Sequence, residues 1–396
     1  MFPLTIGIIV FGVALLITFG ASRDWPRTKS RPGVTVVICA RDEEKYLMDC
    51  LMSLSTQDYP NDKYSIILVD HLSKDGTGEL MDYYASYSPV PTRVIHITEE
   101  DPVLKGKVHA LDVGLSQVET EYVLLTDGDC IVPETWISTL MAHFTESMLA
   151  VGGFVTVGRL GTQDTAVARL QHVDHRYYLG MLCGLAGLRA PGSKHPHVRD
   201  SLPPFVRRIV SRMRPAFCIG NNLAFRMSVY REIGGYRAVG PSLVEDYALM
   251  NALSRRSKKH LAIIKDPGAR VITTPEKDLH SLWRQKRRWG TATGILNPLS
   301  VLLFTLIILI RTVIPWFLFI HPIEASLALL LMTIGDILVI SLVSHGTMDK
   351  VRWQDILFHE IYQIVLNTLL VLANMIRWPV VWKGQRYPNR SHTKSA

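Results

Sequence analysis

The sequence predicts an α/β domain with a mostly parallel sheet, joined to transmembrane and interfacial helices. Between residue 32 and about residue 290, apolar runs rich in β-branched residues alternate with helical stretches, as in a parallel sheet covered by helices. A charge-free apolar run precedes this region, and a second apolar region follows it from about residue 295. With 396 residues, of which 48% are hydrophobic, the chain is long enough to bury a large core.

The first element is an apolar run over residues 2–20, about as long as a membrane-spanning helix. A cleaved signal peptide is the competing interpretation, but the run has no basic segment before it and no small-x-small cleavage site after it. The residues that follow are basic instead: Arg23, Arg27, Lys29 and Arg31. We therefore expect an uncleaved anchor at 1–21, with the chain after it in the cytosol by the positive-inside rule.

Three strand-like runs in the next region lead into acidic residues. Residues 34–39 are a continuous, mostly β-branched run shortly before Asp42, and later runs end at Asp70 and Asp127. The stretch after the first run is helical in pattern, because Leu47, Cys50, Leu51 and Leu54 fall on one face with Tyr46. Ligands of such sheets bind at the carboxyl ends of the strands, so we expect a site lined by these carboxylates.

The formal net charge of +8 is compatible with nucleic acid, anionic lipid or phosphorylated small molecules as partners. The basic clusters flank apolar helices and form no separate groove, which disfavours nucleic acid. Residues 205–214, after a predicted long loop at 189–204, place apolar side chains on one helical face and arginines on the other. This pattern predicts a helix lying on an anionic bilayer, with an ordinary surface helix as the alternative.

One short segment is a candidate metal site. Asp127 and Asp129 flank Gly128, and two carboxylates so close together repel each other unless a cation lies between them. Hard oxygen ligands of this kind suit Mg²⁺ or Mn²⁺, although an ordinary turn after a strand is the alternative. The five cysteines have no paired spacing, so we expect reduced thiols, neither a disulfide framework nor a zinc site.

Seven short motifs occur in a characteristic order: "ICARDEE", "LVDHLSKDGT", "KGKVHAL", "LLTDGDC", "CIGNNLAFR", "LVEDYALM" and "QKRRW". Together they resemble the membrane-integrated family 2 glycosyltransferases with a GT-A (nucleotide-diphospho-sugar transferase) fold, a group similar to polysaccharide synthases and ceramide-type lipid glucosyltransferases. The resemblance covers about residues 32–290. Each motif alone is weak, but the ordered set is specific.

The resemblance implies a nucleotide-sugar site, with a cation at the DxD motif. The residues implied at the nucleotide-sugar are Ala40, Asp42, Asp70, Lys107, Asp127 and Gly128, and those at the metal are Asp127 and Asp129. Asp42 and Asp70 would accept hydrogen bonds from uracil and ribose, and a side chain at Gly128 would crowd the donor. Capping of the next helix is the alternative for Asp42, and a solvated side chain is the alternative for Lys107.

For catalysis, the resemblance implies that Asp246 of the Glu245-Asp246 pair is the general base for the acceptor hydroxyl, in a single displacement with inversion. An acidic pair favoured at a helix start is the alternative. In the QxxRW motif, Gln285, Arg288 and Trp289 would serve the diphosphate and the acceptor, or anchor the chain at the bilayer surface. The residues of "GNNLAFR" leave open whether Asn221 and Asn222 bind acceptor hydroxyls or are structural.

The region 295–376 is predicted to be membrane-embedded, followed by a basic cytosolic tail at 377–396. We expect two crossings, at about 296–320 and 326–345, with a non-crossing helix over 356–377; a third crossing is the alternative. Arg311 inside the first crossing would face protein, water or Asp336, because a lone charge in lipid is costly.

The resemblance, together with the apolar runs and their basic flanks, implies a membrane-bound enzyme of the inner or plasma membrane, whose catalytic domain over 32–290 faces the cytoplasm. It would move a sugar from a nucleotide-sugar, with UDP-sugar favoured, to a lipid hydroxyl with the help of Mg²⁺ or Mn²⁺. A processive β-polysaccharide synthase and a non-catalytic membrane scaffold are the alternatives. The sugar, the acceptor and the oligomeric state are left open by the sequence.

Overall fold

A computed structural model describes residues 1–158, 165–189, 203–212, 220–290, 298–348, 350–376, 379–382 and 385–387. The chain forms two compact units. The sheet unit comprises residues 24–160 and 216–274, and the helical unit comprises residues 1–23, 161–215 and 275–396. The chain therefore passes from one unit to the other four times.

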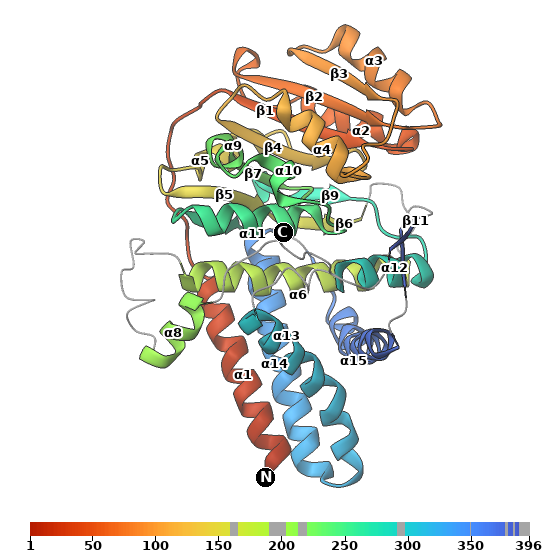
Figure 1. The fold of residues 1–396 in the computed structure, drawn as a ribbon. Coiled ribbons are helices and arrows are strands. Elements are labelled where there is room, and N and C mark those ends of the chain that lie inside the picture. Colours follow the sequence, from red (N-terminus) through yellow and green to blue (C-terminus); the bar gives the residue numbers. More distant parts are fainter. Residues whose placement is uncertain are drawn as a thin grey trace. The chain divides into compact units, whose positions relative to one another are not determined.

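The sheet unit contains a seven-stranded sheet in the order β3-β2-β1-β4-β7-β5-β8 (Figure 1). Its strands are β1 (Val34–Ala40), β2 (Tyr64–His71), β3 (Thr92–Ile97), β4 (Tyr122–Asp127), β5 (Met148–Gly153), β7 (Leu223–Arg226) and β8 (His260–Ile264). Only β7 runs antiparallel to its neighbours within this sheet. A second, two-stranded sheet pairs β6 (Val155–Val157) with β9 (Val271–Thr273) in parallel. The predicted mostly parallel α/β sheet is confirmed.

Helices alternate with the strands along the sheet unit's sequence. They are α2 (Glu44–Ser55), α3 (Thr77–Tyr87), α4 (Lys107–Ser116), α5 (Trp136–Ala142), α9 (Met227–Glu232), α10 (Gly235–Val239) and α11 (Glu245–Arg256), with short 3₁₀ turns at Asn61–Lys63 and Pro267–Ala269. The predicted apolar face of α2 is buried, because Leu47, Cys50, Leu51 and Leu54 are each inaccessible to solvent. The 3.6-residue pattern thus orients this helix toward the β-branched strands, where Val36 and Ile38 are also fully buried.

The helical unit contains long apolar helices and shorter amphipathic ones. They are α1 (Phe2–Ala21), α6 (Ala166–Arg189), α8 (Pro204–Arg212), α12 (Leu279–Gly290), α13 (Pro298–Val313), α14 (Pro322–Gly346) and α15 (Trp353–Met375), with a 3₁₀ segment at Ile314–Phe319 and a β10 (Val380–Trp382) and β11 (Gln385–Tyr387) hairpin. Among the described residues, three helices are long and apolar enough to cross a membrane: Phe2–Ala21, Pro322–Gly346 and Trp353–Ala373. The number of crossings and the non-crossing role of the last helix stay predictions.

Small residues bring α1 close to α6. A Cβ atom added to Gly20 of α1 would collide with the backbone of Gly184 in α6, and one added to Gly187 would collide with the backbone of Gly20. The same kind of contact joins α1 to α14, where a Cβ on Gly335 would lie 2.7 Å from the Cβ of Ala14. Such small-residue contacts are typical of helices packed in membranes, where close backbone approach replaces the hydrophobic drive.

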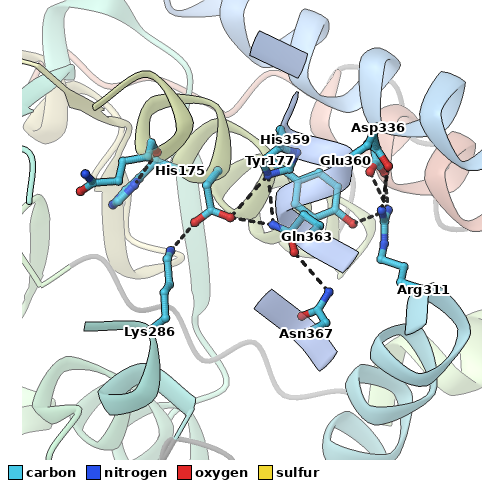
Figure 2. Close-up of polar contacts among 11 residues, drawn as sticks. His175, Tyr177, Lys286, Arg311, Asp336, His359, Glu360, Gln363 and Asn367 are labelled. Atoms are coloured by element: carbon cyan, nitrogen blue, oxygen red, sulfur yellow. Dashed lines mark hydrogen bonds and ion pairs between the residues drawn. The ribbon is translucent and has the colours of Figure 1, made fainter. Parts of the chain in front are cut away.

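Buried charges join the apolar helices (Figure 2). The Arg311 guanidinium of α13 donates two hydrogen bonds to the Asp336 carboxylate of α14, at 2.6 and 2.7 Å, and one to Glu360 of α15 at 3.2 Å. The predicted pairing of Arg311 with Asp336 is therefore confirmed. The polar side of α15 also contacts protein groups, because Gln363 donates to Asp174 of α6 and Asn367 donates to Gln363.

Several predicted features lie wholly or partly outside the described residues. These are the loop at 190–202, Met213 and Arg214 of the amphipathic segment, Cys218, and most of the basic tail. The described part of that segment forms α8 as expected, with Phe205 exposed and Val210 buried. Cys39, Cys50 and Cys130 are free thiols.

Candidate active site

The carboxyl ends of three neighbouring strands form the acidic edge of the sheet unit, as predicted. In the parallel register, Ala40 at the end of β1 lies opposite Asp70 of β2, and Cys39 lies opposite Asp127 of β4. Asp70 and Asp127 therefore flank the end of β1 at almost the same level. Asp42 follows two residues after Ala40. The expected convergence of the three carboxylates is a consequence of strand register.

Asp42 lies in a turn that interlocks with the loop after β2. Its backbone is left-handed, with φ of 56°, which is uncommon for a residue with a side chain. The Lys74 backbone N–H donates to Asp42 Oδ1 at 2.8 Å, and the Asp42 N–H donates to Ser73 Oγ at 3.2 Å. The residue before α2 is Glu43, whose side chain makes no capping hydrogen bond, and the Glu44 N–H at the start of α2 donates to Asp75 Oδ2 at 3.2 Å. The alternative role of Asp42 as a helix cap is therefore wrong.

The Asp70 carboxylate is held by hydrogen bonds with Ser73 and His96. Its Oδ1 accepts the Ser73 backbone N–H at 3.3 Å, and its Oδ2 lies 3.2 Å from His96 Nδ1. The hydrogen bond to Asp70 raises the pKa of His96, with Asp82 on the other ring nitrogen acting in the same direction. Hydrogen bonds thus join the turn at Asp42, the end of β2 at Asp70 and the loop at Ser73 and Lys74.

Lys107 bridges two carboxylates. It is the first residue of α4 and follows Gly106, whose φ of 64° suits glycine. Its Nζ lies 2.6 Å from Asp127 Oδ1 and 3.3 Å from Glu245 Oε1. Burial alone would lower the pKa of Lys107, but the two carboxylates outweigh it and raise that pKa overall. The sequence predicted a nucleotide contact for this lysine and missed its role as a shared counter-ion.

Asp129 lies half-buried beside Asp127, just after the end of β4. Burial, followed by repulsion from Asp127, raises the pKa of the Asp129 carboxyl. Its Oδ2 accepts the hydroxyl of Thr273 at 3.0 Å, and Thr273 is the last residue of β9. Thr273 was missed by sequence reasoning, because a threonine 144 positions away carries no local signal of this contact.

Gly128 is tightly packed. A Cβ atom at this position would lie 3.2 Å from the Ala40 Cβ and 3.4 Å from a Leu47 methyl carbon. These neighbours belong to β1 and α2, so the side chain would press on protein atoms beneath the turn. The fold thus gives a packing reason for this glycine, and the clearance for the donor stays a prediction.

The donor set at this turn fits a hard divalent cation. Two carboxylates lie on either side of Gly128, and the pKa of Asp129 is raised by burial and then by repulsion from Asp127. Lys107 neutralises part of the charge on Asp127, so Asp129 is the less compensated carboxylate of the pair. Carboxylate oxygens with room for ligand phosphates are the usual protein ligands of Mg²⁺ and Mn²⁺.

Asp246 is a half-buried carboxylate held by two backbone donors. The Gly220 N–H donates to Oδ2 at 2.8 Å, and the Tyr247 N–H donates to Oδ1 at 2.7 Å. Burial, with repulsion from Glu245, nevertheless raises the pKa of Asp246 to about 6. A Cβ on Gly220 would lie 3.0 Å from the Asp246 Cβ, so this glycine lets its backbone approach the carboxylate. A carboxylate with this pKa is charged at neutral pH and can accept a proton.

Asn222 has a structural role, and its proposed contact with an acceptor is wrong. Its Oδ1 accepts the Trp136 indole N–H at 2.9 Å, and its Nδ2 donates to the carbonyls of Phe154 and Ala269 at 2.9 and 2.8 Å. The side chain is fully buried, so no valence remains for a sugar. Asn221 Nδ2 lies 3.6 Å from Cys130 Sγ.

The QxxRW residues lie on α12 of the helical unit, which holds this helix by a buried ion pair. Lys286, inside the motif, forms an ion pair with Asp174 of α6 (Figure 2). Its Nζ also lies 4.1 Å from the centroid of the Trp289 ring. Trp289 also stacks with Tyr178, with ring centroids 6.4 Å apart. Gln285 Nε2 donates to Glu276 Oε1 at 3.1 Å, and Arg288 lies one turn further along the helix. The role of Lys286 was missed, although it lies within the quoted motif.

The sequence matches two known protein families. The family described as "Glycosyltransferase like family 2" matches residues 32–292, about two thirds of the chain. The chain belongs to glycosyltransferase-like family 2. A second family, "Glycosyl transferase family 21", matches residues 207–395 of this family 2 protein.

The fold is that of a GT-A glycosyltransferase. Mannosyltransferase PcManGT from Pyrobaculum calidifontis, solved in complex with GDP-Man and Mn²⁺, superposes with a TM-score of 0.57 at 19% identity, covering 94% of this chain and 99% of that one. This likeness confirms the α/β GT-A fold.

Curated relatives match over shorter stretches. Probable glycosyltransferase YdaM of Bacillus subtilis is 30% identical over 66% of this chain and 55% of its own length. Glycosyltransferase AglE of Haloferax volcanii is 29% identical over 28% of this chain and 34% of its own length. Beta-monoglucosyldiacylglycerol synthase of a Synechocystis strain is 26% identical over 28% of this chain and 23% of its own length. The match thus spans about a quarter to a half of the length of these three relatives.

Proposed function

We propose that this family 2 protein transfers a sugar from a nucleotide-sugar, with UDP-sugar the favoured donor, to a lipid hydroxyl, with inversion at the anomeric carbon. The observation that carries the proposal is the Lys107 bridge. One ammonium joins Asp127 of the DxD motif to Glu245, which precedes Asp246 in the chain. The donor-side carboxylates and the proposed base therefore belong to one charge cluster in the sheet unit.

The acidic edge and this charge cluster have separate roles in the proposal. Asp42 and Asp70, at the ends of β1 and β2, bind the uracil and ribose of the donor, and Lys107 contacts the nucleotide when the diphosphate arrives. Asp246 accepts the proton of the acceptor hydroxyl as that oxygen attacks the anomeric carbon. The hydrogen bonds from Gly220 and Tyr247 fix the direction of the Asp246 carboxylate for this transfer.

Asp129 and Asp127 would hold Mg²⁺ or Mn²⁺, with Asp129 the principal ligand because Lys107 already neutralises Asp127. The bound cation would supply Lewis-acid stabilisation of the leaving nucleoside diphosphate. Thr273 orients Asp129 through its hydroxyl, and Arg288 and Trp289 serve the diphosphate and the acceptor.

A lipid acceptor is favoured by the helical unit and by one relative. Three described helices are long and apolar enough to cross a membrane, and few helices follow the family 2 region for a polymer channel. The Synechocystis relative is by its name a glycolipid synthase. The basic residues after α1, Arg23, Arg27 and Lys29, support a catalytic region that faces the cytoplasm of an inner or plasma membrane. Processive synthesis of a β-polysaccharide is the alternative.

The test is a donor and product assay on the full chain purified in detergent. Nucleotide release is measured with a panel of UDP-sugars and GDP-mannose, in Mg²⁺ or Mn²⁺, with membrane lipid extract as the acceptor. Radiolabel from the sugar should then partition into the organic phase. Water-soluble polymeric label would replace the lipid acceptor by the polysaccharide alternative, and release of nucleotide from no donor would refute the transferase assignment.

Asp246→Asn separates binding from chemistry. The variant should bind the donor as the parent does, while turnover falls by at least about a hundredfold, since general base catalysis contributes roughly that much. Asp62→Asn, an exposed aspartate in the turn Asn61–Lys63, is the matched control and should keep full activity. Unchanged turnover in Asp246→Asn would remove the base assignment.

A further inference from the structure

A cluster of two histidines and one glutamate lies beside the acidic edge and has no part in the proposed reaction. His71 is the last residue of β2, Glu100 lies in the loop after β3, and His109 is on the first turn of α4. Both histidines are buried, and Glu100 is about one quarter exposed. We propose that these three side chains form a second metal site, for a transition metal of the Zn²⁺ class.

The distances in the cluster are those of a ligand set. His71 Nε2 lies 3.2 Å and His109 Nδ1 lies 3.6 Å from the same oxygen, Glu100 Oε1, and the three ligand atoms all lie within 4.8 Å of one another. Bonds of 2.0–2.1 Å in a tetrahedral zinc site place neighbouring ligand atoms about 3.4 Å apart. The two distances to Glu100 Oε1 are already close to this value, so only the two imidazole nitrogens would need to move closer to each other when an ion binds.

The ligand types in the cluster restrict which metal ions it can bind. Two imidazoles and one carboxylate suit zinc and its neighbours in the first transition row, whereas Mg²⁺ prefers oxygen alone. Three protein ligands leave one tetrahedral position for water, and the partial exposure of Glu100 gives that position a route to solvent. The two cation sites of the sheet unit would therefore differ in selectivity.

Existing hydrogen bonds are compatible with this occupancy. The Gly106 N–H donates to Glu100 Oε1 at 2.8 Å and would orient the ligating carboxylate from the second shell. The Asp101 N–H donates to His109 Nδ1 at 3.3 Å, a long bond that the ion would replace. Asp101 itself is engaged by Arg237 at 2.8 Å and is not a ligand.

Occupancy would tie together parts of the fold that flank the nucleotide-binding residues. His71 follows Asp70 directly, and the loop from Glu100 leads through Gly106 to Lys107. An ion bound to all three ligands closes the loop between β3 and α4 onto the end of β2. Removing the ion should therefore loosen this loop, without removing any residue of the proposed reaction.

The test is metal binding by the full chain in detergent, after treatment with a chelator. Zn²⁺ bound at equilibrium is measured by dialysis and elemental analysis for the parent, His71→Ala, His109→Ala and Glu100→Gln. Asp129→Asn removes the principal carboxylate of the DxD motif, and His96→Ala removes an exposed histidine of the same edge as the matched control. We expect one equivalent of Zn²⁺ that Asp129→Asn and His96→Ala retain and that the three cluster variants lose.

Co²⁺ absorption keeps the proposal testable if a cluster variant does not fold. Four-coordinate Co²⁺ absorbs visible light much more strongly than six-coordinate Co²⁺, so the Asp129→Asn protein loaded with Co²⁺ should show intense visible bands. Addition of Zn²⁺ should bleach them. An Asp129→Asn protein that binds no Zn²⁺, or cluster variants that bind as much as the parent, would overturn the site in favour of a purely hydrogen-bonded cluster.

Discussion

Replacing Asp246 by asparagine should stabilise the protein at neutral pH. The pKa of this carboxyl is raised from its ordinary value of 3.8 to about 6, chiefly by burial and then by Glu245. Each pH unit corresponds to about 1.36 kcal/mol, so keeping the group ionised costs about 3 kcal/mol of folding free energy at pH 7.5. Asparagine keeps one acceptor oxygen but leaves either the Gly220 or the Tyr247 N–H unpaired, which costs about 1 kcal/mol.

The expected net gain is therefore about 2 kcal/mol, or a rise in Tm of about 4–8 °C for a domain of this size. The sign of the pH dependence follows from linkage. A carboxyl whose folded pKa is raised destabilises the fold above that pKa, and the penalty fades as pH falls toward the unfolded value. With folded and unfolded values of about 6 and 3.8, the penalty falls from about 3 kcal/mol at pH 7.5 to about 1.6 kcal/mol at pH 5.

The assay is thermal unfolding of the full chain in detergent, followed by tryptophan fluorescence at pH 7.5 and pH 5. Asp246→Asn should unfold at a higher temperature than the parent at pH 7.5, and the difference should shrink at pH 5. Asp62→Asn, at an exposed position, should match the parent at both values. A lower Tm for Asp246→Asn, or an equal increase at both pH values, would show that the carboxylate is not held under an electrostatic penalty.

Three further substitutions test the packing. Arg311→Met should cost about 3–5 kcal/mol by leaving buried carboxylates unpaired, and adding Asp336→Leu should recover part of the lost Tm; no recovery would contradict a direct pair. Asn222→Ala should destabilise the fold by more than about 2 kcal/mol, because a buried indole N–H and two backbone carbonyls lose their hydrogen-bond partner; an unchanged Tm would contradict this. Gly184→Leu should abolish monodisperse protein on size-exclusion chromatography, whereas Gly12→Leu, at an open position, should not.

The acidic edge could be predicted because each of its parts carries a local signal. Continuous β-branched runs indicated the strands, and the parallel register then places Asp70 and Asp127 on either side of β1. The pairing of Arg311 with Asp336 was predictable for a different reason. A charge in an apolar helix requires a partner, and the adjacent apolar segment offers a single carboxylate.

The remaining features depend on contacts that sequence patterns do not encode. The donor to Asp246 is the backbone N–H of Gly220, which has no side chain to signal its function. Asn222 was ambiguous, because a lone polar residue before an apolar run fits a ligand contact and a buried hydrogen-bond hub equally well. The packing around Gly128 could not be predicted, since only the fold shows that Ala40 and Leu47 lie beside it.

The four passages of the chain between the two units constrain how this protein can be made and cut. Residues 216–274 of the sheet unit, which carry β7 and β8, are synthesised only after α6 and α8 of the helical unit. The seven-stranded sheet therefore stays incomplete until part of the helical unit has been made. Deleting α1 and the residues after 274 would not yield an isolated sheet unit, because 161–215 would remain inserted in it. An isolated sheet unit would need residue 160 joined directly to residue 216, so neither unit can be obtained by trimming the ends of the chain alone.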